Sequence, residues 1–234
     1  AGPAGLEAAR ALGQRGFDVL LAERERRLGG RINLESALPG FTEWARVRDW
    51  RESQLAKLPN VEIFRESTMT AESVLELGAA HVVIATGARW RTDGFGRATP
   101  VPPIRAAFPN LHAPEDIIRG ASPEGTILVY DDERYVMASA LALKLLAAGR
   151  QVIYATPAPI VSEWTAHTNE QPAIQGRLIA SGARLIFGKA LAGFDGKAVE
   201  LVCLYTGQSE RIAVDALVPV TARQPERDLY DALQ

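Results

Sequence analysis

Hydrophobic and polar positions follow two periods along this chain, one typical of amphipathic helices and one typical of buried strands. Residues 4–15 place their apolar side chains at helical spacing, and Gly16 is expected to end this helix. Residues 17–22 form a short apolar run that predicts a buried strand. A helix followed directly by such a strand indicates part of a βαβ unit.

The same patterns predict the remaining elements. Thr42 is the expected N-cap of the second helix, Gly149 is the expected end of the fourth, and a Pro-rich connection spans 99–114. The expected helices are 4–15, 42–58, 69–75, 133–148, 170–181 and a last one after Pro225. The expected strands are 17–22, 61–64, 80–87, 126–130, 151–155, 183–187, 190–194, 198–205, 209–213 and 216–221. Alternating helices and strands predict an α/β fold with parallel sheets and helices on both faces.

Glycines at the start of the chain indicate a nucleotide-binding turn. Gly2 and Gly5 match the second and third glycines of the G-x-G-x-x-G pattern. The second glycine of that pattern lets the backbone approach a pyrophosphate, and the third lets the helix pack closely. The first glycine and the first strand would precede residue 1. We therefore expect a Rossmann-like unit whose first strand is truncated.

A carboxylate at the end of the next strand strengthens this interpretation. Glu23 follows the glycines by about 20 residues, where an acid accepts both hydroxyls of an adenosine ribose and repels a 2′-phosphate. Arg24 is a candidate contact for the adenine or the phosphates, and the adjacent glycines at 29–30 allow a close approach of the backbone to a ligand. The alternative is an ordinary glutamate at a solvated strand end.

A second βαβ unit, around strand 126–130, has lost its glycines. The turn after this strand carries Asp131, Asp132 and Glu133, which we expect to cap the helix that follows. Carboxylates at this position would repel a pyrophosphate, so the turn is predicted not to bind NAD(P)H. A metal site built from the three acids is less favoured, because no fourth ligand is evident.

Composition narrows the functional classes. A net charge of −2 gives no basic surface for nucleic acid, and no apolar run has the length of a membrane span. The single cysteine, Cys203, excludes an intrachain disulfide, fits a cytoplasmic protein and is expected to be a small core residue. No residue is predicted to be catalytic, and no metal site is predicted, because the three histidines lack ligand spacing.

Several segments together resemble the flavoprotein disulfide-reductase superfamily, which has two dinucleotide-binding domains. More narrowly, the chain resembles the C-terminal half of the trimethylamine, dimethylamine and histamine dehydrogenases and of the related dienoyl-CoA reductases, within the NADH:flavin oxidoreductase family. The superfamily resemblance rests on segments 2–5, 23, 28–31, 84–90 and 218–225, and the narrower one rests on segments 37–44, 48–55 and 85–94.

The resemblance implies a larger enzyme in which an N-terminal barrel holds FMN and an iron–sulfur cluster and performs the substrate chemistry. In the reductases the C-terminal half binds FAD and receives electrons from NADPH, whereas in the trimethylamine dehydrogenase branch it holds only ADP. The implied ligand of this chain is ADP or FAD. The residues implied for its binding are Gly2, Gly5, Glu23, Arg24, Gly30, Arg31, Thr86 and Gly87.

These considerations predict an FAD/ADP-binding domain of residues 1–98 and 215–234 and a second, degenerate NAD(P)-binding-like domain of residues 99–214. The first hypothesis is a nucleotide-binding fragment without catalysis of its own, whose partner is the barrel of the parent enzyme. One alternative is an interface module with a non-functional nucleotide site, open to homo-oligomerisation. The other is a working NADPH–FAD reductase domain, against which the acids at 131–133 argue.

Overall fold

The computed structural model describes residues 1–234 and contains two compact units. Unit 1 comprises Ala1–Arg89 and Pro225–Gln234, and unit 2 comprises Trp90–Gln224. The chain crosses between them in β3 (Ala88–Trp90) and β11 (Arg223–Pro225), which pair with each other. None of the helices combines the length and apolar character needed to cross a bilayer.

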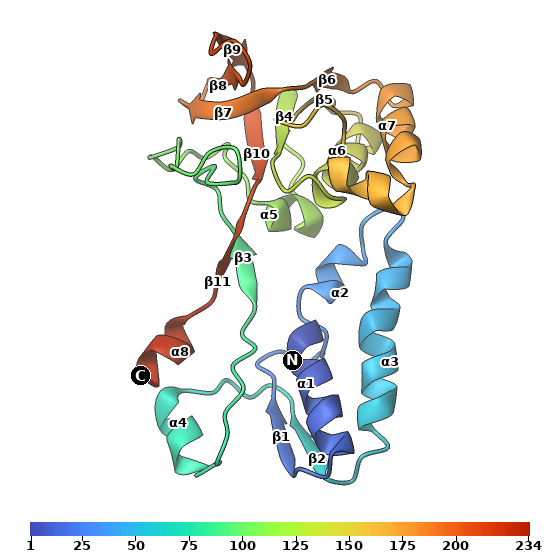
Figure 1. Cartoon of the computed structure of the whole chain (residues 1–234), viewed down its shortest axis with the longest axis vertical. Coiled ribbons are helices and arrows are strands. Elements are labelled where there is room, and N and C mark those ends of the chain that lie inside the picture. Colours follow the sequence, from blue (N-terminus) through green and yellow to red (C-terminus); the bar gives the residue numbers. More distant parts are fainter. The chain divides into compact units, whose positions relative to one another are not determined.

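Unit 1 is built around a pair of parallel strands, β1 and β2. Helices α1 and α3 lie side by side (Figure 1), and α1 packs against this pair of strands. The elements of unit 1 are α1 (Pro3–Gln14), β1 (Val19–Ala22), α2 (Ile32–Glu35), η1 (Thr42–Trp44), α3 (Ala45–Leu55), β2 (Val61–Phe64), α4 (Ala71–Glu76) and α8 (Asp228–Ala232).

The core of unit 1 follows from the two periods of its sequence. Leu6 and Ala9 share one face of α1, three residues apart, and meet Leu55 of α3. Alternate residues of the strands pack against them, because successive strand side chains point to opposite faces. The strand residues on this side are Val19, Leu21, Val61 and Ile63. At the end of α1, Gly16 takes a left-handed φ of 87°, as expected of a glycine that follows a helix.

Two predictions for unit 1 are wrong. Residues 81–87 form no strand, and Val82 and Val83 are exposed rather than buried. The reason is that β1 is bonded to β2 alone, so no neighbouring strand reaches residues 81–87. The expected helix 42–58 is divided into η1 and α3, and Thr42 caps neither of them.

Unit 2 contains a four-stranded parallel sheet with the order β10-β4-β5-β6, as the alternating pattern predicted. An antiparallel meander, β7-β8-β9, accompanies it. The elements are α5 (Pro114–Arg119), β4 (Thr126–Asp131), α6 (Met137–Ala147), β5 (Gln151–Ala155), η2 (Glu163–Thr168), α7 (Gln171–Ala180), β6 (Arg184–Ile186), β7 (Lys189–Phe194), β8 (Ala198–Cys203), β9 (Ser209–Ala213) and β10 (Ala216–Val220).

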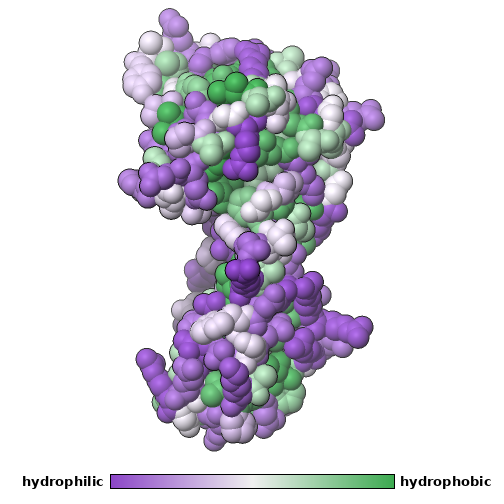
Figure 2. Space-filling view, turned by 90° about the vertical axis from the view of Figure 1, so that its right-hand side faces the viewer, coloured by the Kyte–Doolittle hydropathy of each residue, from purple (hydrophilic) through white to green (hydrophobic).

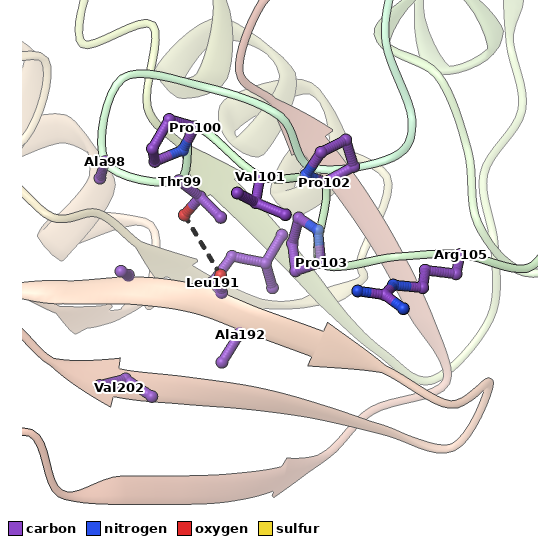
Figure 3. Close-up of a pocket in the computed structure, with 11 residues that line it drawn as sticks. Ala98, Thr99, Pro100, Val101, Pro102, Pro103, Arg105, Leu191, Ala192 and Val202 are labelled. Atoms are coloured by element: carbon purple, nitrogen blue, oxygen red, sulfur yellow. Dashed lines mark hydrogen bonds between the residues drawn. The ribbon is translucent and has the colours of Figure 1, made fainter.

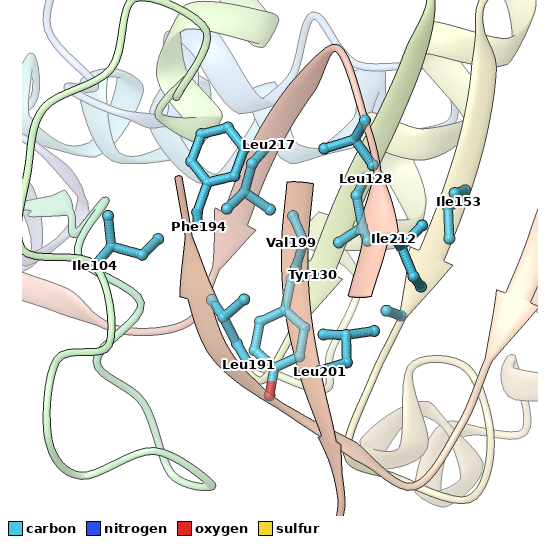
Figure 4. Packing of buried hydrophobic residues seen from close by; sticks show 12 residues of the cluster. Ile104, Leu128, Tyr130, Ile153, Leu191, Phe194, Val199, Leu201, Ile212 and Leu217 are labelled. Atoms are coloured by element: carbon cyan, nitrogen blue, oxygen red, sulfur yellow. The ribbon is translucent and has the colours of Figure 1, made fainter. Parts of the chain in front are cut away.

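The main core of unit 2 lies between the parallel sheet and the meander, as Figure 4 shows. Leu128 and Tyr130 are two residues apart on β4 and therefore point to the same face. Helices were expected on both faces, but the meander covers this one. The parallel sheet also contributes Ile153 and Leu217 to this core. The meander contributes Leu191, Phe194, Val199, Leu201 and Ile212.

Two further expectations in unit 2 need correction, and one helix, α5, was not predicted. The helix predicted from residue 133 begins only at Met137. The short helix α5 follows the Pro-rich connection directly, with Pro114 at its first position, where proline is tolerated. Cys203 is half-buried at the end of β8 instead of lying in the core.

On the face drawn in Figure 2, hydrophobic residues form patches among hydrophilic ones.

Candidate nucleotide site

The amino end of α1 is open for an anion. Gly2 is its N-cap and Pro3 follows at the first helical position, with no side chain capping the helix and no acid in its first turn. The first amides of a helix have no partner within the helix, and its amino end carries partial positive charge. The amino end of α1 thus offers the donors and the field that favour a phosphate.

The loop of residues 28–31, here called the diglycine loop, packs against this turn. The amide of Gly29 donates to the carbonyl of Ala1 at 2.9 Å. Gly30 has a left-handed φ of 52°, and a Cβ at this residue would lie 2.9 Å from the Cα of Gly2. A side chain at residue 30 is therefore excluded twice, by its φ and by this close approach.

Gly5 has a packing role. A Cβ added at Gly5 would lie 3.3 Å from the Cβ of Ala85, so the absence of a side chain lets α1 approach the segment 81–87. This is the role that the third glycine of the pattern has in a dinucleotide-binding unit. The two predicted glycines thus serve different contacts of α1: Gly2 lies against Gly30, and Gly5 lies against Ala85.

Glu23 lies directly after β1 and is 8% exposed. Burial disfavours its charge, but hydrogen-bond donors around it, among them the amide of Glu25 at 2.9 Å, outweigh this effect and lower the pKa of Glu23. The side chain is therefore a carboxylate at neutral pH. A carboxylate can accept hydrogen bonds but cannot donate them, which suits a pair of ribose hydroxyls.

The two predicted arginines lie at the surface. Arg24 is exposed and forms an ion pair of 3.6 Å with Glu25, and Arg31 is exposed and forms one of 3.6 Å with Glu35. The exposed pair of Arg24 and Glu25 contributes little to stability, so Arg24 is not held rigidly by its partner, whereas Arg31 pairs with a buried glutamate. Their contact with a nucleotide stays a prediction.

Thr86 and Gly87 are bonded to the last part of unit 1. The hydroxyl of Thr86 donates to the carbonyl of Glu226 at 2.6 Å, and the amide of Glu226 donates to the carbonyl of Gly87 at 3.0 Å. Gly87 has a φ of 85° with open space around it. The structure thus gives these two residues a tethering role, and their predicted contact with a nucleotide is untested.

We predict that Gly30→Ala is more harmful than Gly40→Ala. Both positions have a left-handed φ, 52° and 84°, but an added Cβ clashes only at residue 30. Each substitution should cost about 1–2 kcal/mol from the backbone conformation, and the clash at residue 30 should add about 1–3 kcal/mol. Urea unfolding of the two variants measures the difference. Equal destabilisation would contradict the close packing of the diglycine loop.

The turn after β4 in unit 2, residues 131–135, is here called the acidic turn. Its first two carboxylates are buried and do not cap α6, so the predicted capping role is wrong. Asp131 accepts from the amide of Arg134 at 2.7 Å and from the hydroxyl of Tyr154. Asp132 accepts from the amide of Ala98 at 2.8 Å. The acids are turned toward the protein interior because their acceptors satisfy donors there.

Burial sets the protonation of this turn. Desolvation raises the pKa of Asp131 to about 7, against the lowering effect of the hydrogen bonds from Tyr154 and Arg134. Burial also raises the pKa values of Asp132 and Tyr154. The carboxyl end of β4 is therefore filled by acidic side chains where an active dinucleotide-binding domain has a glycine turn.

The raised pKa of Asp131 predicts a pH dependence of stability. Above about pH 4 the unfolded aspartate releases its proton, whereas folded Asp131 keeps it up to about pH 7. Folding then takes up a proton, so the free energy of unfolding of unit 2 should fall as the pH rises from 5 to 8. Asp131→Asn should flatten this dependence in melting curves.

The matched control is Asp195→Asn, because hydrogen bonds from the amides of Lys197 and Ala198 lower the pKa of this exposed aspartate. The contribution of Asp195 to the free energy of unfolding is present above the pKa of the unfolded aspartate and is lost only at lower pH. Asp195→Asn should therefore leave the slope of stability against pH between 5 and 8 unchanged. A wild-type slope that Asp131→Asn leaves intact would contradict the assignment to Asp131.

The pocket beside β7 offers little chemistry. No group of three or more histidine, cysteine, aspartate or glutamate side chains could hold a metal ion. A pocket of about 410 Å³ lies between residues 98–105 and β7 (Figure 3). Its walls are mostly proline, alanine, valine and leucine, with Thr99 bonded to the carbonyl of Leu191 and Arg105 as its charged residue.

Two polar residues near the diglycine loop were missed from the sequence. Arg48 of α3 is buried and donates to the side chain of Asn33 at 2.6 Å. Asn33 in turn donates to the carbonyl of Leu28 at 2.9 Å. A signal existed, because Arg48 lies seven residues before the buried Leu55 and therefore on the same helical face.

Comparison with known proteins shows that this chain is similar to amine dehydrogenases. Residues 1–99 match the family described as pyridine nucleotide-disulphide oxidoreductase. Dimethylamine dehydrogenase from Hyphomicrobium sp. (strain x) is 40% identical over 164 residues, which are 67% of this chain and 22% of that protein. The structure of histamine dehydrogenase from Rhizobium sp. 4-9 is 42% identical, with a TM-score of 0.93 over 100% of this chain and 36% of that chain.

More distant structures share the fold alone. A ferredoxin reductase from Rhodopseudomonas palustris is 18% identical, with a TM-score of 0.57 over 100% of this chain and 60% of that chain. The α/β fold class with parallel sheets and the resemblance to the amine dehydrogenases are both confirmed. The chain spans 22% and 36% of the two amine dehydrogenases.

Proposed function

We propose that this relative of the amine dehydrogenases binds the ADP portion of a nucleotide in unit 1, either as ADP or within FAD. The carrying observation is the uncapped amino end of α1 packed against the diglycine loop, with Glu23 ionised at the end of β1. Phosphates would lie at the amino end of α1, and the ribose would lie at Glu23. Arg24, Arg31 and the segment at Thr86 and Gly87 would flank the nucleotide.

The charge of Glu23 supports a preference for an unphosphorylated ribose. A 2′-phosphate beside this buried carboxylate would place like charges together where few water molecules screen them. Two ribose hydroxyls, in contrast, can both donate to it. The site should therefore favour ADP, NAD or FAD over NADP.

Unit 2 is proposed to bind neither NADH nor NADPH. Its acidic turn has no glycine, and Asp131 and Asp132 already bond the nearby amides of Arg134 and Ala98. A pyrophosphate would have to displace these bonds and face further carboxylate charge. The acidic turn therefore disfavours the working NADPH–FAD reductase among the alternatives.

The chemistry of the whole enzyme is proposed to reside outside these 234 residues. The chain spans 22% of dimethylamine dehydrogenase and contains no candidate metal cluster. We propose a partner domain, an N-terminal barrel with FMN and an iron–sulfur cluster, that oxidises an amine, and a cytoplasmic location for the assembly. In this scheme unit 1 supplies nucleotide binding and no catalytic residue.

An interface role is the second candidate, and the free edge of β1 favours it. This strand is bonded on one side only, and Leu20, Val82 and Val83 are about half exposed. Unpaired strands with apolar side chains tend to pair with further chain. A strand of the parent enzyme or of a second copy would fit this edge, which leaves homo-oligomerisation as the competing outcome.

Calorimetry with ADP, FAD, NAD and NADPH tests the proposed function. The wild-type chain should bind ADP and should bind NADPH much more weakly. Glu23→Gln removes the charge that faces the ribose. It should weaken ADP binding about tenfold, which corresponds to the loss of one charge-assisted hydrogen bond. Glu25→Gln is the control, because this side chain is 69% exposed and pairs with Arg24.

Size-exclusion chromatography on the same samples separates the two candidates. ADP binding that Glu23→Gln weakens and Glu25→Gln leaves intact supports the nucleotide site. A chain that binds no nucleotide and forms a dimer supports the interface role instead. Tight NADPH binding with flavin absorbance would overturn the assignment of unit 2.

A further inference from the structure

We infer that Arg48 is a positioning residue that acts through Asn33 to hold the diglycine loop in its phosphate-facing conformation. This inference rests on the proposed nucleotide site of unit 1. Arg48 lies in α3 and is not among the residues that the sequence implies for nucleotide binding. Its guanidinium nevertheless reaches the residues that fix the loop.

The connection is a short chain of hydrogen bonds. Nη1 of Arg48 donates to Oδ1 of Asn33 at 2.6 Å, and Nδ2 of Asn33 donates to the carbonyl of Leu28 at 2.9 Å. Because Arg48 binds the oxygen of the Asn33 amide, it directs the amide nitrogen toward Leu28. The carbonyl that begins the diglycine loop is thus held by an oriented donor.

The stem of Arg48 also shapes the loop sterically. A Cβ at Gly29 would lie 2.8 Å from Cδ of Arg48 and 2.7 Å from Oδ1 of Asn33. Gly29 itself has a φ of 113°, and on its other side its amide bonds Ala1. The loop is therefore enclosed between α3 and the start of α1.

A buried guanidinium needs a reason, because charged side chains are rarely buried without partners. Arg48 satisfies its donors in two directions, since Nε donates to Asp49 at 2.7 Å while Nη1 serves Asn33. The planar fork of arginine can do both at once, whereas the single ammonium of lysine cannot match this geometry. This division of donors favours a positioning role over simple charge neutralisation.

The consequence concerns phosphate, not adenosine. The loop holds Gly30 against Gly2 at the amino end of α1, where the diphosphate is proposed to bind. The proposed ribose acceptor, Glu23, is held by a separate bond from the amide of Glu25. Loosening the loop should therefore weaken ADP binding and leave adenosine binding unchanged.

The test compares Arg48→Met with Arg46→Met, a matched arginine of α3 whose side chain is 81% exposed and pairs with Glu43. Calorimetry measures ADP, NMR titration measures adenosine, and the phosphorus resonances of bound ADP report the diphosphate environment. Arg48→Met should weaken ADP about tenfold, as for the loss of one buried hydrogen bond, and shift the bound phosphorus signals. Arg46→Met should do neither.

Asn33→Asp is the second variant, in case Arg48→Met fails to fold. It keeps an acceptor for Arg48 and loses the donor to Leu28, so ADP binding alone should again fall. Equal losses for ADP and adenosine, or unchanged ADP binding in a folded variant, would overturn the inference. A wild-type chain that binds no ADP would overturn the proposed function itself, which makes the two failures distinguishable.

Discussion

The contact between Gly2 and Gly30 is the constraint on which unit 1 depends. Backbone meets backbone there, with no room for a Cβ at residue 30, and the bond from Gly29 to Ala1 fixes the register. This packing brings the amino end of α1 and the diglycine loop to one place. Gly5 in turn keeps α1 close to Ala85, so the glycines act by what their missing side chains allow.

The two units use carboxylates in opposite ways. In unit 1, donors around Glu23 outweigh its burial and keep it ionised, ready to accept hydrogen bonds. In unit 2, burial dominates at Asp131 and raises its pKa to about 7, so the acid bonds the interior instead of a ligand. A carboxylate at the end of a strand is thus available to a ligand in unit 1 and is used for internal hydrogen bonds in unit 2.

Local sequence pattern predicted much of the fold, because the hydrophobic period of α1, β2 and β5 is contained within each short segment. It failed at residues 81–87, where strand formation requires a neighbouring strand that pattern alone cannot supply. It also placed Asp131 at a helix end, because burial of its side chain against Tyr154 depends on tertiary packing. Arg48 was missed for the same reason, although its place on the buried face of α3 was a signal.

Hydrogen exchange measured with and without ADP tests the central claim most directly, since it reports each turn separately. The account predicts that ADP slows exchange in residues 1–6 and 28–35, where α1 begins and the diglycine loop lies. Residues 130–136, which include the acidic turn, should exchange at an unchanged rate. Protection of the acidic turn, or of neither region at saturating ADP, would contradict the assignment of nucleotide binding to unit 1.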